Sequence, residues 1–219
     1  MKGTPTAILI GIAFMIIALI IESAIESIPA LLEILKYGIK DYVTKLASFE
    51  LLNPILYSVF IGLAAGVSQE TMKYIAVDTR GKELAFWIGL GFAIVDIVFL
   101  MSEELLSGSL YRLTAKLIIL TSLNIVFSLL FHPGTAELLK AGRVIGKGIY
   151  YLAVTFLIHG LVDGGLVYAD IEAILHPRET LIIILYWALA FPVSIAMIIV
   201  GSYYLSKSKE VKSVDATVF

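Results

Sequence analysis

The chain has 219 residues, 59% of them hydrophobic, with a mean hydropathy of +0.96 and a formal net charge of −2. This composition excludes a soluble globular domain, in which about half of the residues at most are apolar. The charge gives no indication of nucleic-acid binding, and the absence of cysteine excludes disulfides, thiolate metal sites and a cysteine nucleophile. The chain also holds only two asparagines and one glutamine, a scarcity of thermolabile side chains that is typical of thermophiles.

Six hydrophobic segments are each about long enough to cross a bilayer, which needs roughly 20 apolar residues. They cover residues 6–28, 55–77, 84–101, 110–131, 149–168 and 180–205. The first has no small-residue cleavage site, so we interpret it as a helix and not as a signal peptide. No hydrophilic block is long enough for a second domain. We therefore predict an all-α protein, with residues 1–219 forming one polytopic bundle of about six transmembrane helices.

The segments between these spans are predicted from their charge and their turn residues. Residues 29–50 are too charged to span and favour an amphipathic helix in the membrane interface. His132-Pro133-Gly134 is expected to end the fourth span, and residues 135–148 to form a polar loop. Residues 206–219 are expected to be a polar, frayed tail.

The distribution of lysine and arginine predicts the orientation of the bundle. With six spans and an inner N-terminus, nine basic residues fall on the inner side and five on the outer side. The inner set is Lys2, Arg80, Lys82, Lys140, Arg143, Lys147, Lys207, Lys209 and Lys212, and the outer set is Lys36, Lys40, Lys45, Arg112 and Arg178. Cytoplasmic segments carry the excess of positive charge. We expect a multi-pass protein of a prokaryotic cell membrane with both termini in the cytoplasm.

The second span contains Gln69, Glu70 and Lys73. A charge near the centre of a bilayer costs from about 2.5 to more than 10 kcal/mol, so such groups normally face a protein interior or a water-filled cavity. Glu70 and Lys73 are three residues apart, which places them on one face of a helix where they can pair. A purely structural ion pair is the alternative to a functional site.

Other ionisable residues lie in or beside the remaining spans: Asp96, His132, His159 and Asp163. We expect Glu70, His132, His159 and Asp163 to meet in one cavity open to the cytoplasmic side. Glu70 would then activate water, a histidine would stabilise the oxyanion, and Asp163 would fix the tautomer of His159. Glu22 and Glu26, near the far end of the first span, are interpreted as interfacial and not catalytic.

Metal binding is a weaker alternative for the same residues. A set of Glu70, His132 and His159 could hold a divalent ion such as zinc, but the chain has no HExxH motif. We expect no cofactor.

Four motifs in chain order resemble those of a superfamily of intramembrane proteases. Gln69-Glu70-Thr71-Met72-Lys73 resembles the EExxK/R motif, and Gly89-Leu90-Gly91-Phe92-Ala93 with Asp96 resembles the glycine-rich third-helix motif. His132 resembles the single histidine of the next span, and His159-Gly160-Leu161-Val162-Asp163 resembles the HxxxN/D motif. The superfamily includes the CAAX-processing and bacteriocin-processing (CPBP) family, PrsW and YhfC, and YhfC is the most similar branch. The resemblance covers about residues 55–168.

This resemblance implies a glutamate-dependent peptidase that acts on membrane proteins or lipidated peptides within the lipid bilayer. Glu70, His132, His159 and Asp163 would be catalytic, and Gln69, Lys73 and Asp96 would support them. The chain departs from the family pattern at Gln69, which stands where the motif has its first glutamate, and at Ser128, where the motif has phenylalanine. A relative that binds membrane proteins without cleaving them therefore remains an alternative, as does a proton-coupled transporter that uses Glu70, Asp96 and Asp163.

Overall fold

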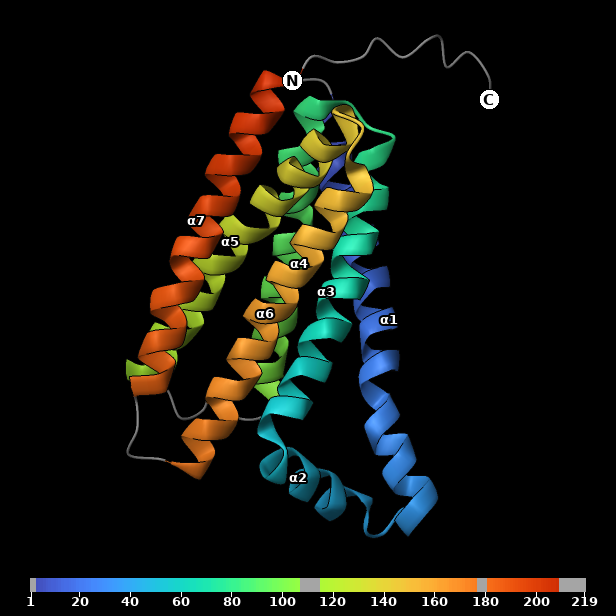
Figure 1. The fold of residues 1–219 in the computed structure, drawn as a ribbon, viewed down its shortest axis with the longest axis vertical. Coiled ribbons are helices and arrows are strands. Elements are labelled where there is room, and N and C mark those ends of the chain that lie inside the picture. The colour runs from blue at the N-terminus through green and yellow to red at the C-terminus, as the bar shows by residue number, and fades with distance from the viewer. Residues whose placement is uncertain (1–2, 107–114, 177–180, 209–219) are drawn as a thin grey trace.

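The computed structural model describes residues 3–106, 115–176 and 181–208, and within them it contains α-helices and one short 3₁₀ turn but no strand. Figure 1 shows the helices as one elongated bundle. Their bounds are α1 Thr4–Tyr37, α2 Tyr42–Leu52, α3 Pro54–Asp78, η1 Lys82–Leu84, α4 Ala85–Leu106, α5 Ala115–Val144, α6 Gly148–Leu175 and α7 Leu181–Lys207. The predicted all-α bundle is confirmed.

Six of the described helices are long and apolar enough to cross a membrane: α1, α3, α4, α5, α6 and α7. Their outer faces are apolar, with Leu161 75% exposed and Leu189 71% exposed, whereas Glu70 and Lys73 are fully buried. Apolar side chains outside and charges inside are the arrangement that a lipid environment requires. The six predicted spans therefore correspond one by one to six helices.

The helices form a closed ring around a polar centre. Helix α3 packs on α6 and α1, α4 packs on α1 and α5, and α7 packs on α5 and α6. The two ends of the bundle carry different elements. Helix α1 begins and α7 ends at one of them, and α2 crosses the other (Figure 1). Because none of its residues is buried, α2 is a surface helix.

Glycine allows α3 and α6 to touch through their backbones. A Cβ atom on Gly62 would lie 2.1 Å from the carbonyl oxygen of Gly160 and 2.7 Å from the amide nitrogen of Gly164. Small residues give helices in lipid this close approach. The contact brings the polar face of α3, with Glu70, against His159 of α6.

The predicted end of the fourth span is wrong. Helix α5 continues through Pro133 to Val144, so His132 lies inside the helix and residues 135–144 are helical and not a loop. Packing overrides the local signal: a Cβ atom on Gly134 would lie 2.5 Å from the backbone nitrogen of Ile198 in α7. Lys140, further along α5, is buried and donates to the carbonyl oxygens of Val77 and Asp78 at the end of α3. The predicted start of this span at residue 110 lies outside the described residues.

The predicted amphipathic segment 29–50 is also divided differently. Helix α1 passes Pro29 and ends at Tyr37, where Gly38 takes a positive φ of 82°, and α2 then covers only Tyr42–Leu52. Proline removes one backbone hydrogen bond, which membrane helices tolerate. Helices α4 and α6 likewise run about one or two turns past their predicted ends, to Leu106 and Leu175. Most of the predicted polar tail lies outside the described residues.

Candidate active site

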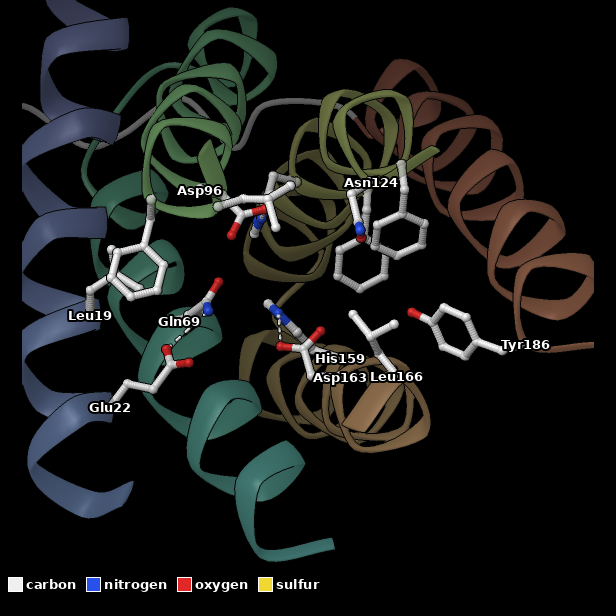
Figure 2. A pocket seen from close by; sticks show the side chains of 14 residues that line it. Leu19, Glu22, Gln69, Asp96, Asn124, His159, Asp163, Leu166 and Tyr186 are labelled. Carbon is white, nitrogen blue, oxygen red and sulfur yellow. Dashed lines mark hydrogen bonds and ion pairs between the residues drawn. The ribbon is translucent and has the colours of Figure 1, made fainter. Parts of the chain in front are cut away.

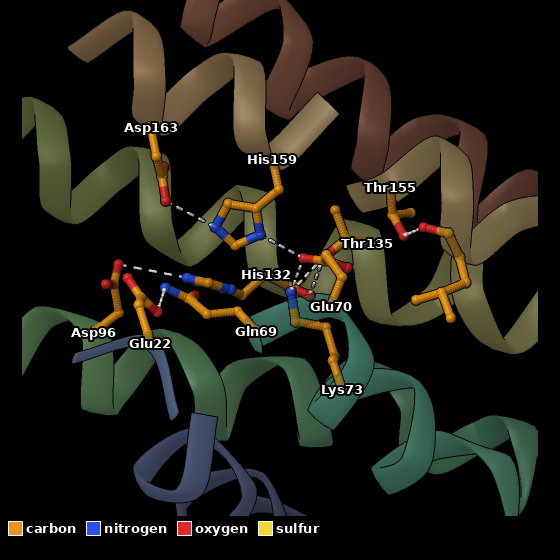
Figure 3. Close-up of polar contacts among 11 residues, drawn as sticks. Glu22, Gln69, Glu70, Lys73, Asp96, His132, Thr135, Thr155, His159 and Asp163 are labelled. Carbon is orange, nitrogen blue, oxygen red and sulfur yellow. Dashed lines mark hydrogen bonds and ion pairs between the residues drawn. The ribbon is translucent and has the colours of Figure 1, made fainter. Parts of the chain in front are cut away.

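A buried ion pair within α3 lies at the centre of the bundle, and its lysine is hydrogen-bonded to α5. The Nζ atom of Lys73 donates to Oε1 of Glu70 at 2.5 Å and to Oγ1 of Thr135 at 2.8 Å (Figure 3). Both charged side chains are 0% exposed. The predicted pairing of Lys73 with an intramembrane acid is confirmed, and the acid is Glu70.

His159 links this ion pair to a second carboxylate. Its Nδ1 atom lies 2.6 Å from Oε1 of Glu70, and its Nε2 atom lies 3.2 Å from Oδ2 of Asp163, one turn further along α6 (Figure 3). The imidazole is almost completely buried between the two carboxylates. An imidazolium can donate to both at once, so the carboxylates hold the ring in one orientation.

A second imidazole faces the first. Nε2 of His132 in α5 lies 3.4 Å from Oδ2 of Asp96 in α4, and the centroids of the two histidine rings are 5.6 Å apart. Phe131 packs edge-on against both rings. Two histidine–aspartate pairs from three helices therefore converge, although 27 residues separate the histidines in the chain.

Gln69 links α3 to α1 by a hydrogen bond between side chains. Its Nε2 atom donates to Oε2 of Glu22 at 2.9 Å (Figure 3). The interpretation of Glu22 as an interfacial residue is wrong, because α1 continues to Tyr37 and Glu22 consequently falls in the middle of the helix. Pro29, the expected end of the first span, lies inside α1 and does not end it.

These polar groups surround a cavity of about 190 Å³, shown in Figure 2. Its lining includes His132, His159 and Asp163, as predicted, but not Glu70, which lies behind His159. All six membrane-length helices contribute to it. The lining residues are Leu19, Glu22, Gln69, Asp96, Phe99, Leu100, Asn124, Phe127, Phe131, His132, His159, Asp163, Leu166 and Tyr186.

The cavity extends toward the end of the bundle that carries α2. Phe99 and Leu100 follow Asp96 toward the end of α4, and Leu166 follows Asp163 toward the end of α6. Those helix ends lie at the α2 end of the bundle (Figure 1). We expected the cavity at the end that carries the termini. The difference arises because α5 continues for three turns beyond His132, and this continuation fills that end.

Three buried polar atoms of the site have no hydrogen-bond partner among the described residues: Gln69 Oε1, Glu70 Oε2 and His132 Nδ1. Buried polar atoms in proteins are nearly always paired with protein groups or with water. The atoms of Gln69 and His132 belong to side chains that line the cavity. They are therefore available to polar groups of a water molecule or a ligand.

The metal alternative does not fit the arrangement of the donors. Within the described residues, no group of three or more His, Cys, Asp or Glu side chains is arranged to hold a metal ion. Both ring nitrogens of His159 are directed at carboxylates, and Oε1 of Glu70 accepts from Lys73. The expectation that the protein needs no cofactor stays a prediction.

The predicted set of seven site residues is brought together, and the structure adds four that we had not assigned to the site. Glu22, Asn124 and Tyr186 line the cavity, and Thr135 binds Lys73. The polarity of Asn124 inside an apolar span was a usable signal. Tyr186 carried none, because tyrosine is common near the ends of membrane helices.

Comparison of the chain with protein-family models, with curated proteins and with solved structures finds no match.

Proposed function

We propose that this protein is an intramembrane peptidase that hydrolyses peptide bonds of membrane-associated substrates. The observation that carries the proposal is the cavity, because two imidazoles, two aspartates and one glutamine converge on it from four helices inside a bundle of membrane-spanning length. Peptide hydrolysis needs a base for water, groups that stabilise an oxyanion and a cavity that excludes bulk solvent. This cavity offers groups suited to the first two tasks, and its position inside the bundle suits the third.

In this proposal His132 stabilises the tetrahedral oxyanion, because its Nδ1 atom has no hydrogen-bond partner among the described residues, whereas both ring nitrogens of His159 face carboxylates. The rings of the two histidines face each other across 5.6 Å, and each is held by an aspartate. An N–H directed at a developing oxyanion in a site of low dielectric is worth more than the same contact in water. Asp96 and Asp163 would set the tautomer and the orientation of the rings.

We assign Glu70 a supporting role in place of the predicted role as base. It does not line the cavity, and Oε1 already accepts from Lys73 and faces Nδ1 of His159. A carboxylate in this position holds the imidazole and balances its charge, as the buried acid does in a nucleophile–histidine–acid arrangement.

The order of the four sequence motifs supports the same proposal, because it resembles the order in the CPBP, PrsW and YhfC proteases. We also propose a location in a prokaryotic cell membrane with both termini in the cytoplasm, the orientation that the distribution of lysine and arginine favours. The substrates would be single-span membrane proteins or lipidated peptides.

The test is cleavage by the purified protein in liposomes that contain a panel of single-span substrates. We expect wild type to cleave at least one substrate and His159→Ala to abolish cleavage, because the alanine removes the imidazole that faces His132 and that links Glu70 to Asp163. Lys40→Met, which removes a cation on the surface, serves as the control and should retain activity. Cleavage that survives both His159→Ala and Glu70→Gln contradicts the proposal.

One observation favours a second candidate, a module that binds membrane proteins without cleaving them. The amide of Gln69 lines the cavity, and the carboxylate of Glu70 is paired with Lys73. An amide can bind a peptide group but cannot take a proton from water. Binding of single-span peptides that depends on the cavity, with no cleavage of any of them, would favour this candidate.

A further inference from the structure

We propose that Glu22 of α1 is the general base of the cavity, the carboxylate that takes a proton from the attacking water. This inference depends on the proposed peptidase function and adds to it a residue from a helix outside the four sequence motifs. It starts from the hydrogen bond between Glu22 and Gln69 and from the position of Glu22 in the cavity wall.

Four carboxylates surround the centre of the bundle, and their partners differ. Glu70 is paired with Lys73 and faces His159, while Asp96 and Asp163 each face a histidine ring nitrogen. Glu22 accepts its one described side-chain hydrogen bond from the neutral amide of Gln69. Among the carboxylates that line the cavity, Glu22 is the one whose described side-chain partner is neither an imidazole nor an ammonium group.

The nature of the partner decides which carboxylate can act as a base. A cation that donates to a carboxylate favours its charged form and makes it a poor proton acceptor. A neutral amide orients the carboxylate but stabilises its charge less. Gln69 Nε2 binds only Oε2 of Glu22, which leaves the other carboxylate oxygen for water.

The position of Glu22 suits a water molecule bound on one side of the cavity and a substrate carbonyl held on the other side. Figure 2 shows Glu22 and Gln69 on the α1 and α3 side of the cavity, and His159 and Asp163 on its α6 side. A peptide carbonyl in the cavity would direct its oxygen toward the imidazole of His132, whose Nδ1 atom has no described partner, and its carbon toward a water bound by Glu22. General bases work from within hydrogen-bond reach of the proton that they abstract.

The proposed reaction proceeds in two steps. Water transfers a proton to Glu22 while its oxygen bonds to the carbonyl carbon, and the carbonyl π electrons move to the carbonyl oxygen, which accepts a hydrogen bond from His132. The oxyanion then reforms its C=O bond, the C–N bond breaks, and Glu22 returns the proton to the leaving nitrogen. The products are a carboxyl group and an amine, and Glu22 ends in its original ionised state.

The main alternative is that the Glu22–Gln69 contact only holds α1 against α3. The variant Glu22→Gln separates the two interpretations, because its amide oxygen can still accept the hydrogen bond from Gln69. A structural role predicts that this variant keeps its activity. A role as base predicts that kcat falls by about 10²–10⁴-fold, the range for general acid–base assistance. Glu26→Gln, one turn further along α1 and outside the cavity lining, is the matched control and should keep its activity.

A carboxylate swap completes the experiment. The double variant Glu22→Gln/Gln69→Glu keeps an amide–carboxylate pair between α1 and α3 but moves the carboxylate to α3. We measure kcat, the pH profile and the melting temperature for wild type, both Glu22 variants and Glu26→Gln on one substrate in liposomes. Two results together would support the proposal. The first is a loss of kcat in Glu22→Gln that the double variant recovers. The second is an acidic limb in the pH profile that wild type, Glu26→Gln and the double variant show and Glu22→Gln lacks.

The remaining outcomes each overturn it in a distinguishable way. Full activity of Glu22→Gln removes Glu22 as the base and leaves the peptidase function intact. A fall in kcat of Glu22→Gln that comes with a fall in its melting temperature shows a structural contact. Absence of cleavage by wild type overturns the peptidase function and the role of Glu22 together.

Discussion

The ammonium group of Lys73 and the carboxylate of Glu70 are both completely buried, and each depends on the other for its charge to be tolerated. Removing one partner of such a pair leaves an uncompensated charge and costs about 3–5 kcal/mol. We therefore expect Lys73→Met to lower the melting temperature in detergent clearly. Thermal unfolding followed by circular dichroism measures it.

A double variant provides the control for this prediction. Lys73→Met/Glu70→Gln removes both charges and should recover part of the lost stability, because neither charge is then left unpaired. Lys40→Met, on the surface, should unfold like wild type. An unchanged melting temperature in Lys73→Met would mean that the buried pair does not form.

Gln69 leads to a prediction about rate. The variant Gln69→Glu places a second carboxylate at the position of an amide that lies 2.9 Å from Glu22. Two carboxylates at this distance cannot both ionise easily, so they share a proton, and one can act as acid while the other acts as base. We expect peptidase activity in wild type to be slow and Gln69→Glu to raise kcat, within the range of about 10²–10⁴-fold for general acid–base assistance.

The measurement compares initial cleavage rates over a range of pH on one substrate. Gln69→Ala is the control, since it removes the amide without adding a carboxylate and should not exceed wild type. A rate that falls in Gln69→Glu, while the melting temperature stays unchanged, would contradict the shared-proton argument.

At the scale of elements, the contact between α3 and α6 determines how closely Glu70 approaches His159. In Gly62→Ala the new methyl group would collide with the backbone of Gly160, which cannot move aside as a flexible side chain could. Overpacking typically costs about 1–3 kcal/mol, so we expect a lower melting temperature and separation of the two helices.

Gly165→Ala is the matched control on α6, because a Cβ atom there would lie 3.4 Å from the Tyr186 ring, at ordinary contact distance. Alanine favours a helix over glycine by about 1 kcal/mol, so this variant should be at least as stable as wild type. Equal stability of the two variants would show that the α3–α6 contact is looser than described.

Helix ends show where local signals fail in this chain. Pro29 and Pro133 each indicate the end of a helix, and both lie inside one. At Pro133 the packing beyond the proline outweighs the lost backbone hydrogen bond, as Gly134 shows where it meets α7. Past Pro29 none of the α1 residues is buried, and membrane helices tolerate the lost bond. Pro54, in contrast, begins α3, because the first turn of a helix needs no amide donor there.

At the scale of the whole molecule, six membrane crossings place three segments on one side of the membrane: the start of α1, the turn between α3 and α4, and the end of α7. Helix α2 lies on the other side. The natural chain has no cysteine, so single cysteines can report on this topology. We expect Ser48→Cys in α2 to react with an impermeant maleimide in intact spheroplasts. Thr79→Cys and Ser206→Cys should react only after lysis.

All three positions are exposed on the surface of the bundle. A cysteine there that fails to react with the maleimide is therefore shielded by the membrane and not buried in the protein. The cysteine-free natural chain is the control for background labelling. Reversal of all three results would keep the topology but place the termini outside. Thr79→Cys and Ser206→Cys reacting on different sides would contradict six crossings.

The sequence by itself determined the membrane-spanning class, the number of long helices, and the Glu70–Lys73 pair, because each follows from composition or from spacing along one helix. Hydrophobic length predicts a span whatever it packs against, and a separation of three residues places two side chains on one face. The membership of His132, His159 and Asp163 in one cavity was also predicted, from their depth.

Only the tertiary structure decided where the cavity lies and which carboxylates reach it. Glu70 is the most prominent acid in the sequence, yet it lies behind His159, while Glu22 of α1 lines the cavity beside Gln69. No local pattern could show this, because it depends on how far α1 continues past Pro29 and on how closely glycine lets α3 approach α6. Contacts between distant segments decide which polar groups a buried site contains.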